Sequence, residues 1–327
     1  MAKCNLKNRL LQLRISQCVL TILCLIAISQ FFSCFGNYNY PHLPADVIET
    51  QLFKQTNPTL VLKKGNLDCK YDHILKSKES IDSWDIPKSN NDFAATGVVN
   101  GSYAPEGCNP LFSVAILVTY RNRQSQLDVF LPYMHNFLRR QNIHYKIYLI
   151  EQQDEKPWNK GVLYNIGAKH AINDKFPCLI LHDVDLLPLD RANLYACTAE
   201  PRHMSASIDK FRYVLTYESL VGGVMAIKTD QFVMVNGLSN KFEGWGGEDD
   251  DFAARIEAHQ LNIVRFPRAM SRYSMLVHRQ EPRNGERLRI LSENRRQRTA
   301  ADGLGSLAYQ SAQRVHQRLF TLIGVKL

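Results

Sequence analysis

Signatures of the common nucleotide-driven and nucleic-acid-binding proteins are missing from this chain of 327 residues. It has no Walker A motif and no Rossmann glycine fingerprint, so neither ATP hydrolysis nor dinucleotide chemistry is supported. It also has no zinc finger, RNA-recognition signature or recognition-helix arrangement. Its 40 Lys and Arg residues exceed its 31 Asp and Glu residues, but they are scattered along the chain. This moderate positive charge suits an anionic small substrate or a membrane surface better than a nucleic acid.

Acidic residues are absent from residues 1–16, a predicted cytoplasmic tail. The charged residues there are the cations Lys3, Lys7, Arg9 and Arg14. The next segment, residues 18–35, is apolar, uncharged and just long enough for a helix of about 18 to 20 residues to cross a bilayer. Because positive charge keeps its flank in the cytoplasm, we predict a type II signal anchor over residues 17–36. A cleaved signal peptide is the alternative, but its shorter apolar region ends in small residues, whereas residues 31–35 are bulky.

The eight cysteines form two groups of four. One group lies within or before the apolar segment: Cys4, Cys18, Cys24 and Cys34. The other group follows it: Cys69, Cys108, Cys178 and Cys197. In an oxidising lumen the second group indicates two disulfides. The glycosylation acceptor sequence that begins at Asn100 can be modified only on that same side of the membrane.

The chain after the anchor divides into two parts. Residues 37–68 are polar, contain three prolines and show little periodicity, which predicts an irregular stem before a lumenal domain over residues 69–327. Within that domain strands and helices are expected to alternate, over residues 113–119, 127–138, 145–150, 159–172 and 178–182. This order predicts an α/β fold with a mainly parallel sheet covered on both faces. Ligands of such folds bind at the carboxyl ends of the strands.

Two aspartates, Asp183 and Asp185, directly follow the third expected strand. Because side chains alternate along an extended chain, both carboxylates face one side, where they can bind a hard divalent cation. The alternative is a pair of turn aspartates before Pro188. Farther along, Met275 and His278 offer a thioether and an imidazole three residues apart, although packing beside a buried strand is the commoner role of such residues.

Four consecutive carboxylates, Glu248 to Asp251, follow the glycine-flanked Trp245. Glycines let the backbone approach a ligand closely, and the indole gives a flat apolar surface with one donor. The carboxylates can accept protons from a polar substrate, so the segment suits a sugar hydroxyl. The alternative is the acidic N-terminus of an amphipathic helix over residues 249–261, where the helix dipole favours negative charge.

A basic turn, Thr119-Tyr120-Arg121-Asn122-Arg123, follows the first expected strand. Two guanidiniums beside an aromatic ring that can stack on a base would suit a nucleotide diphosphate. A solvated basic turn is the alternative. Since the ATP and dinucleotide motifs are absent, a nucleotide sugar is the remaining nucleotide ligand, and its diphosphate is usually bridged by a metal.

Several motifs occur in a specific order: Tyr120-Arg-Asn-Arg123, Trp158-Asn-Lys-Gly161, Asp183-Val-Asp185, Pro201-Arg-His203, Gly222-Gly223, Gly244-Trp-Gly-Gly-Glu-Asp-Asp-Asp251, Met275-Leu-Val-His278 and Asp302-Gly303-Leu304. Together they resemble the β1,4-galactosyltransferase family, glycosyltransferase family 7, including its β1,4-N-acetylgalactosaminyltransferase branch. The resemblance extends from about Cys69 to about Tyr309. It implies a GT-A type fold, a nucleotide-binding α/β domain with a metal-binding Asp-x-Asp.

The resemblance also implies roles for individual residues. The metal, Mn²⁺, would be bound by Asp185, Met275 and His278. The UDP-sugar donor would contact Tyr120, Arg121, Arg123, Trp158, Lys160, Asp183, Leu220 and Glu248. The acceptor would contact Tyr217, Trp245, Gly247, Asp249 and Asp250, and the disulfides would join Cys69 to Cys108 and Cys178 to Cys197. As general base, Asp249 would take the proton from the acceptor 4-hydroxyl, so that a single displacement inverts the anomeric configuration.

Some residues depart from the galactose-transferring members of the family. Thr119-Tyr120 replaces a common Pro-Phe pair, and Lys160 replaces an arginine; UDP binding tolerates both changes. Leu220 stands where those members have a tyrosine whose phenol crowds the C2 substituent of the donor sugar. A leucine leaves room and an apolar wall for an N-acetyl methyl group, which predicts UDP-GalNAc as the donor. The alternative is that Leu220 is ordinary packing and UDP-Gal is used.

The expected activity is therefore Mn²⁺-dependent transfer of GalNAc to the 4-hydroxyl of terminal β-linked GlcNAc on a glycoprotein or glycolipid. The expected location is the Golgi membrane, with the catalytic domain 69–327 in the lumen. Two alternatives belong to other classes: a catalytically silent lumenal sugar-binding or partner subunit, and a membrane-anchored nucleotide hydrolase. The Arg-rich segment 279–301 is a candidate acceptor-facing mobile loop.

Overall fold

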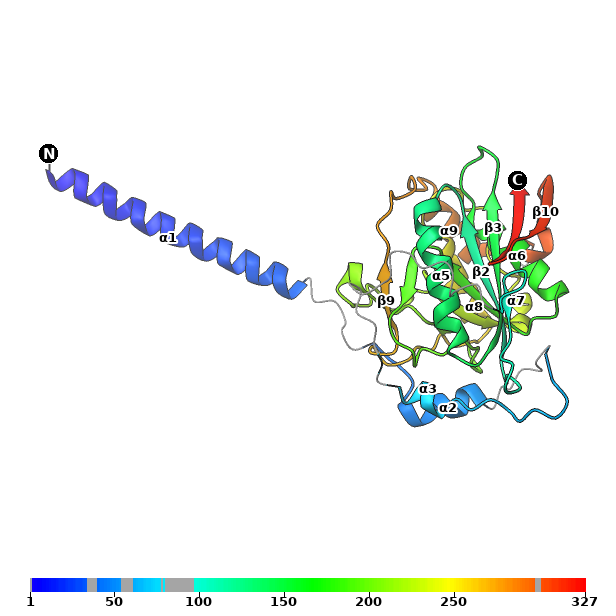
Figure 1. The fold of residues 1–327 in the computed structure, drawn as a ribbon. Coiled ribbons are helices and arrows are strands. Elements are labelled where there is room, and N and C mark those ends of the chain that lie inside the picture. Colours follow the sequence, from blue (N-terminus) through cyan, green and yellow to red (C-terminus); the bar gives the residue numbers. More distant parts are fainter. Residues whose placement is uncertain (1, 34–39, 54–60, 78, 80–96, 298–300) are drawn as a thin grey trace.

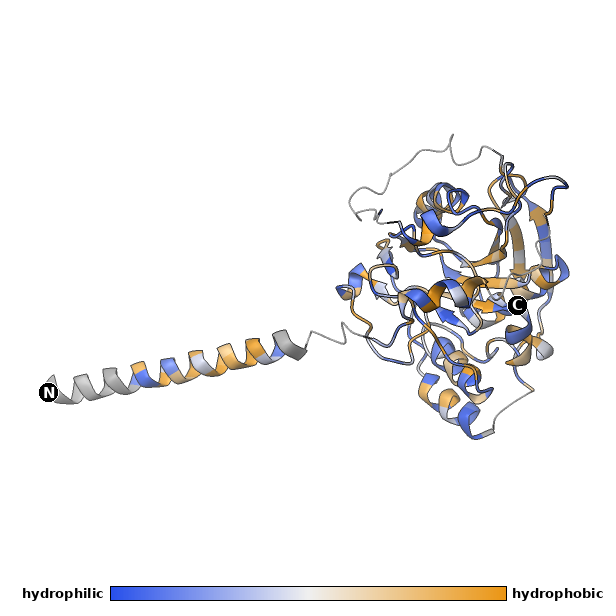
Figure 2. Cartoon of the chain, turned by 90° about the horizontal axis from the view of Figure 1, so that it is seen from below, coloured by the Kyte–Doolittle hydropathy of each residue, from blue (hydrophilic) through white to orange (hydrophobic). Residues whose placement is uncertain are grey.

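The computed structural model describes residues 2–33, 40–53, 61–77, 79, 97–297 and 301–327. Figure 1 shows helices around a central sheet, with the long helix α1 (Ala2–Ser33) apart from them. Within α1, the segment Gln12–Gln30 has the length and apolar composition of a membrane span, and none of it is buried. Figure 2 shows apolar residues gathering along this helix. The segment overlaps the predicted anchor, of which residues 34–36 lie outside the described residues.

The central sheet is mixed and has a parallel core. Its strands are β1 (Ser102–Tyr103), β2 (Ser113–Tyr120), β3 (His144–Gln152), β4 (Cys178–Asp183), β6 (Arg202–His203), β8 (Val224–Lys228), β10 (Ser311–His316) and β11 (Thr321–Lys326). Their order is β10-β11-β3-β2-β4-β8-β6, and β1 pairs with β3. Strands β11, β3, β2 and β4 are parallel neighbours, whereas β8 runs antiparallel to β4. The predicted parallel core is therefore confirmed, whereas the strands outside it pair antiparallel and make the whole sheet mixed.

Helices cover both faces of this sheet. They are α5 (Gln124–Arg139), α6 (Lys160–Asn173), α7 (Thr229–Met234), α8 (Glu248–Ala258) and α9 (Arg287–Gln297), with the short 3-10 turns Asp209–Phe211 and Leu304–Ser306. Alternate residues of β2 belong to different cores: Val114 and Ile116 pack with α5, whereas Ala115 and Leu117 pack with α6. A strand buried on both faces needs a continuous apolar run, which explains the composition of residues 113–119.

A second, three-stranded sheet stands beside the first. It consists of β5 (Leu186–Pro188), β9 (Arg272–Met275) and β7 (Ser207–Ile208), in the order β5-β9-β7. Leu186 pairs with Met275, and the amide of Leu276 donates to the carbonyl of Asp185 over 2.7 Å. This sheet therefore brings the sequence after β4 next to the sequence after β9, although about ninety residues separate them.

Residues 40–53, which we call the N-terminal strap, are not an irregular stem as predicted. They include helix α2 (Ala45–Phe53), in which Ile48 and Leu52 are buried in the core. The ring of Phe53 packs at 5.8 Å from that of Phe112, next to β2. An i, i+4 apolar pair is enough to seat a short helix, and so few residues give little periodicity to detect. Residues 37–39 and 54–60 of the predicted stem lie outside the described residues.

Two disulfides join the four cysteines of the globular part in the pairing that the family resemblance implies. Cys69 bonds to Cys108, and Cys178 bonds to Cys197. The first ties helix α3 (Asp72–Leu75) and the preceding chain to the start of β2, and the second ties β4 to the segment before β6. Cys18 and Cys24 are free and exposed on α1, and Cys34 lies outside the described residues.

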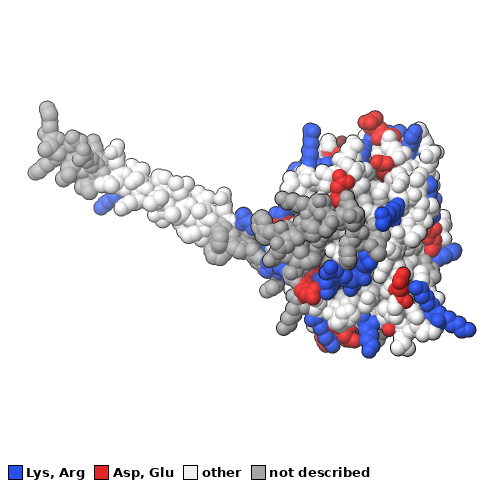
Figure 3. Space-filling model, in the orientation of Figure 1, with Lys and Arg blue, Asp and Glu red and all other residues white. Residues whose placement is uncertain are grey.

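Surface charge is mixed. Figure 3 shows Lys and Arg interspersed with Asp and Glu over the visible face of the globular part. One compact cluster surrounds Asp174, whose carboxylate accepts hydrogen bonds from Lys146, Tyr148 and Arg314. These contacts fasten the end of α6 to β3 and β10. The charges of Lys146 and Arg314 in this cluster are therefore compensated locally by Asp174.

Two buried histidines predict a loss of stability in acid. His135 accepts from the Tyr145 hydroxyl and donates to the Leu319 carbonyl, and burial lowers its pKa to about 4. Burial also lowers the pKa of His144 to about 4. The unfolded chain gains these protons near pH 6.5, and the folded chain does not, so stability is complete above pH 6.5 and falls toward pH 4.

We expect the free energy of unfolding to fall by roughly 2 kcal/mol per histidine between pH 7 and pH 5. Denaturant titration of the detergent-solubilised chain at both pH values measures this change. His135→Gln should remove one histidine's share of the pH dependence, whereas substitution of the exposed His316 should leave it unchanged. Equal pH dependence in all three proteins would contradict the assignment.

Candidate active site

A cleft lies at the carboxyl ends of β2 and β4, where an α/β sheet is expected to bind ligands. Its wall combines residues that follow β2, β4 and β9 with residues from α6 and α8: Thr119, Arg121, Arg123, Trp158, Lys160, Asp183, Val184, Asp185, Lys210, Phe211, Trp245, Glu248, Met275, His278, Gln280 and Glu281. Most of the predicted donor and metal residues therefore meet in one place. The crossover connections explain this, because each returns the chain to the same edge of the sheet.

Asp185, Met275 and His278 converge on one wall of this cleft. Asp185 Oδ2 lies 2.6 Å from His278 Nε2, and the pairing of β5 with β9 brings Met275 beside them. The hydrogen bond that Asp185 accepts from His278 raises the pKa of this histidine. A carboxylate, an imidazole and a thioether can all ligate a transition metal, and a cation bound there would replace the proton that Asp185 and His278 share. Among the described residues, no group of three His, Cys, Asp or Glu side chains is arranged for a metal.

Lys160 also lines this cleft, and several carboxylates lie close to its ammonium group. It is the first residue of α6, where Asn159 caps the helix by accepting from the amide of Val162. The lysine Nζ atom lies 3.0 Å from Asp183 Oδ1, 3.7 Å from Glu248 Oε1 and 3.5 Å from Asp249 Oδ2. One cation is thus shared by three carboxylates, and its side chain is only 12% exposed.

The pKa values of this cluster respond to burial and to the excess of negative charge. Burial raises the pKa of Glu248, and the charge of Asp249 raises it further, whereas Lys160 opposes both effects. Burial likewise raises the pKa of Asp183 against the effect of Lys160. Burial alone would lower the pKa of Lys160, but the carboxylates of Asp183 and Asp249 raise it well above its ordinary value. A further cation or a hydrogen-bond donor from a sugar would therefore be stabilised here.

The acidic segment is both a helix start and part of the site. All four carboxylates occupy the first turn of α8, after Gly247, which has φ 101°. Glu248 and Asp249 turn toward Lys160, and Asp250 Oδ1 accepts from the Tyr217 hydroxyl over 2.9 Å. The segment is therefore the acidic N-terminus of a helix, and the same carboxylates can also serve as hydrogen-bond acceptors for a sugar, so the two interpretations made from the sequence are compatible.

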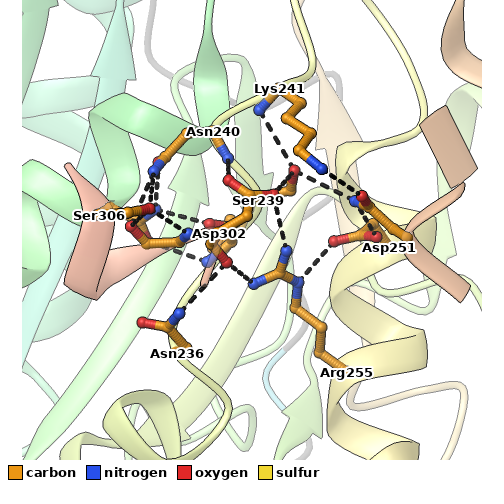
Figure 4. A network of polar contacts seen from close by, with 12 residues as sticks. Asn236, Ser239, Asn240, Lys241, Asp251, Arg255, Asp302 and Ser306 are labelled. Carbon is orange, nitrogen blue, oxygen red and sulfur yellow. Dashed lines mark hydrogen bonds and ion pairs between the residues drawn. The ribbon is translucent and has the colours of Figure 1, made fainter. Parts of the chain in front are cut away.

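Asp251 has a different function from its neighbours, because it belongs to a buried polar network on the other side of α8 (Figure 4). Its carboxylate accepts from Arg255 Nε over 2.6 Å and from Asn294 Nδ2 over 2.8 Å. Arg255 also donates to Asp302, which accepts from Ser239 and from the amide of Asn240. The network attaches α8 to α9 and to the Asp302-Gly303-Leu304 motif, and it thereby fixes the direction in which the first turn of α8 faces the cleft.

Arg121 and Arg123 line the cleft and have a partner that the sequence did not reveal. Glu281 lies 3.6 Å from the Arg121 guanidinium and 3.8 Å from that of Arg123. Arg121 also lies over the ring of Trp158, 5.4 Å from its centroid. Glu281 was missed because it belongs to the segment 279–301, whose spacing carries no recognisable pattern; its only signal is its place three residues after His278.

Trp245 is attached to that same segment. Its amide donates to the Pro282 carbonyl over 2.8 Å, and its carbonyl accepts from the amide of Asn284. Arg283 and Arg287 lie on its ring, with centroid distances of 5.8 and 5.9 Å. The indole remains 42% exposed at the cleft. The tryptophan and residues 282–284 therefore form one unit, and a movement of either requires a movement of the other.

Tyr217 and Leu220 lie beside the carboxylates of α8, although neither of them lines the cleft. A side chain at Gly222 would meet Asp249 Oδ2 at 2.5 Å and Leu220 Cδ1 at 3.6 Å. A side chain at position 222 would therefore force the Asp249 carboxylate to shift, and Leu220 and Asp249 both lie close to this position. Leu220 itself packs against the buried side chains of Tyr40, Ala206 and Leu215.

Leu220 is one of two predicted donor residues that do not line the cleft, and Tyr120 is the other. Its ring is buried in the core shared with α5, and its hydroxyl donates to Gln124 over 3.1 Å. The prediction that it stacks on a base is therefore corrected. As the last residue of a strand buried on both faces, it alternates away from Thr119 and Arg121, which do line the cleft.

Two family models match the globular part of the chain. The N-terminal region of glycosyl transferase group 7 matches residues 69–198, and the N-terminal domain of galactosyltransferase matches residues 202–279. The chain belongs to the glycosyl transferase group 7 family. The family prediction is thus confirmed, and its N-acetylgalactosaminyltransferase branch stays a prediction.

Relatives and solved structures agree with this family. Beta-1,4-galactosyltransferase 4 of Rattus norvegicus is 38% identical over 70% of this chain and 67% of its own length. Beta-1,4-galactosyltransferase 3 of Homo sapiens is 40% identical over 68% of this chain and 58% of its own length. The catalytic domain of Drosophila beta1,4galactosyltransferase 7 in complex with xylobiose has a TM-score of 0.57 at 28% identity, covering 66% of this chain and 94% of that one.

A second structure of the Drosophila protein bears on the ligands. It is a mutant in complex with manganese, UDP-Gal and xylobiose, with a TM-score of 0.57 and 27% identity, and the match covers 66% of this chain and 94% of that one. The GT-A type fold expected from the sequence is confirmed by these matches together with the mixed sheet.

Proposed function

We propose that this group 7 glycosyltransferase transfers GalNAc from UDP-GalNAc to the 4-hydroxyl of a terminal β-linked GlcNAc, with inversion at the anomeric carbon. One observation carries the proposal: the carboxylates of Asp183, Glu248 and Asp249 surround Lys160, which lines the same cleft as the close pair of Asp185 and His278. The matching segment is 58% of the human relative's length, so the activity is inferred from this site and not from the relative as a whole.

The two ends of the cleft suit the two ends of a UDP-sugar. Arg121 and Arg123 supply guanidiniums that can bind diphosphate oxygens in bidentate fashion once Glu281 has moved. Asp183 and Glu248 can accept hydrogen bonds from hydroxyls of the ribose and the donor sugar. Trp158 and Trp245 line the same cleft and offer flat apolar surfaces for rings.

The residues present fit Mn²⁺. Asp185, His278 and Met275 would hold the ion, and the contact between the first two supports a common binding point. When bound there, Mn²⁺ would stabilise the negative charge that develops on the leaving diphosphate. The manganese in the complex of the Drosophila relative supports this choice of metal.

Asp249 is the proposed general base. It extends from the N-terminal turn of α8 beside Gly222 and Leu220, and its Oδ2 lies 3.5 Å from Lys160 Nζ. From there it can accept the proton of an acceptor hydroxyl that attacks the donor sugar. Glu248, in the same turn, can orient that sugar, and Tyr217 and Asp250 can bind the acceptor beside it. Attack and departure on opposite faces invert the configuration.

Leu220 supports GalNAc as the donor sugar. Its partly buried side chain continues an apolar cluster next to Asp249, which suits an N-acetyl methyl group. The second candidate donor is UDP-Gal, which is favoured by the names of the relatives in Rattus norvegicus and Homo sapiens.

Exchange of Leu220 tests the donor assignment. We expect Leu220→Tyr to shift the ratio of kcat/KM from UDP-GalNAc toward UDP-Gal by about tenfold or more, because the added ring removes the space for the N-acetyl group. The detergent-solubilised chain is assayed with Mn²⁺, a GlcNAc acceptor and each donor. Leu67→Tyr, at an 85% exposed leucine, is the matched control.

Other outcomes of this assay identify the rival functions. A parent protein that prefers UDP-Gal refutes the GalNAc assignment but keeps the glycosyltransferase. UDP release that is independent of acceptor indicates a nucleotide hydrolase. Binding of UDP without any turnover indicates a silent sugar-binding subunit.

We also propose that residues 17–36 anchor the protein in the Golgi membrane with the catalytic domain in the lumen. The exposed apolar helix Gln12–Gln30 supports the anchor. The disulfides support an oxidising compartment on the side of the globular part, and Asn100 is exposed for glycosylation there. With the strap included, the catalytic unit would begin near residue 40 and not at residue 69.

A further inference from the structure

We propose that the N-terminal strap, residues 40–53, positions the loop 217–223 that forms the wall for the donor sugar, and that Tyr40 and Arg265 are the positioning residues. This inference rests on the proposed function, because it concerns the selection of the donor at the same site. It assigns a role in specificity to a segment that precedes the family match at residue 69.

The strap is attached to the segment around Arg265 by its backbone and by one side chain. The amide of Leu43 donates to the carbonyl of Arg265 over 2.8 Å, and the Tyr40 hydroxyl donates to the carbonyl of Phe266 over 3.1 Å. Tyr40 is 4% exposed, and Leu52 in α2 is fully buried in the core. Residues from 40 to 52 are therefore seated on the domain along their length and are not a free tether.

The first route from the strap to the site is direct packing. Tyr40 forms a small cluster with Ala206 and Leu215, separate from the two main cores. Leu220 packs against this cluster and completes it. Because Tyr40 is the largest side chain of the cluster, its removal would leave a cavity behind Leu220, and the wall would lose its support.

The second route passes through the buried guanidinium of Arg265. Its NH2 donates to the carbonyls of Glu218 and Leu220 over 2.6 and 2.9 Å. Its Nε donates to His203 Nδ1 over 3.2 Å, so His203 Nε2 carries a proton and donates to the Gly222 carbonyl over 3.0 Å. One side chain thus fixes both ends of the loop that contains Leu220.

A movement of the loop 217–223 would also move the proposed reacting groups, because the loop contacts Asp249 and Asp250 directly. A methyl group at Gly222 would lie 2.5 Å from Asp249 Oδ2, so the backbone of the loop is in close contact with that carboxylate, and Tyr217 donates to Asp250. A displacement of the loop by a few tenths of an ångström therefore alters both the wall for the donor and the surroundings of the base.

Point substitutions in the full-length chain test this inference. We expect Tyr40→Ala to lower the ratio of kcat/KM for UDP-GalNAc over UDP-Gal by about 5- to 20-fold, because only the GalNAc donor uses the apolar wall. Tyr40→Phe keeps the ring behind Leu220 and should keep the ratio within about twofold. Leu52→Ala is the matched control, since it removes a fully buried side chain of the same strap that belongs to a different core.

Each result has a defined meaning. A ratio that falls in Tyr40→Ala but not in Leu52→Ala supports the proposal, even where both substitutions lower the melting temperature equally. An unchanged ratio in Tyr40→Ala, or an equal fall in Leu52→Ala, would overturn it. A parent protein without preference for UDP-GalNAc would refute the proposed donor instead, so the two failures are distinguishable.

Discussion

Asp249→Asn is expected to lower kcat for sugar transfer by about 10³-fold, within the range that a general base contributes. An amide matches the carboxylate in shape but cannot take the proton of the acceptor hydroxyl. Asp249 is also one of three carboxylates near Lys160, so the asparagine should leave the binding of UDP nearly unchanged. Initial rates with saturating donor and acceptor, and calorimetry with UDP, measure the two quantities.

Asp250→Asn is the matched control for this result. Asp250 is the next residue of the same turn and accepts from the Tyr217 hydroxyl, a bond that an amide oxygen can also accept. We expect its main effect on the KM of the acceptor, with kcat lowered by less than about tenfold. If the two variants lose kcat equally, the turn has a collective electrostatic effect and Asp249 is not the base.

Asp185→Asn is expected to lower metal-dependent transfer by about 10³-fold, since several kcal/mol of charge stabilisation depend on the ion. Loss of one anionic ligand weakens the binding of Mn²⁺ at the point where Asp185 and His278 now meet at 2.6 Å. Paramagnetic resonance of Mn²⁺ measures its binding, and removal of metal from the parent protein by a chelator should reproduce the loss of activity.

Asp190→Asn is the control for the metal prediction. Asp190 follows β5, is buried and accepts from the amide of Ala192, a contact that asparagine can make. The Asp190→Asn variant should bind Mn²⁺ as tightly as the parent protein does. Normal manganese binding by Asp185→Asn would contradict the assignment of that aspartate as a ligand.

The sequence predicted the core of the fold and most of the cleft because local patterns determined both. Strand β2 is a continuous apolar run. Asp183 ends β4 and Asp185 comes two residues later, so the sequence alone placed both aspartates at the edge of the sheet. The resemblance to the family then joined Met275 and His278 to them. The structure supplies the physical cause of that proximity, which is the pairing of Leu186 with Met275.

Features that depend on tertiary packing were not predicted. Tyr120 was assigned to the donor because an aromatic residue beside arginines suits a base, but its register in β2 buries it against α5. The strap looked irregular because its seating depends on a few apolar residues such as Ile48 and Leu52. The contact of Glu281 with Arg121 and Arg123 could not be predicted, because it depends on how the chain after His278 folds back over these two arginines.

The contacts that hold the strap on the globular part also limit the distance between this part and helix α1. Ser33 ends α1, and Tyr40 is already fixed on the globular part, seven positions later. Even a fully extended chain covers at most about 25 Å over that interval. With α1 in a bilayer, as we propose, Tyr40 stays within that distance of the end of the membrane helix, so acceptor chains would have to be reached close to the lipid headgroups.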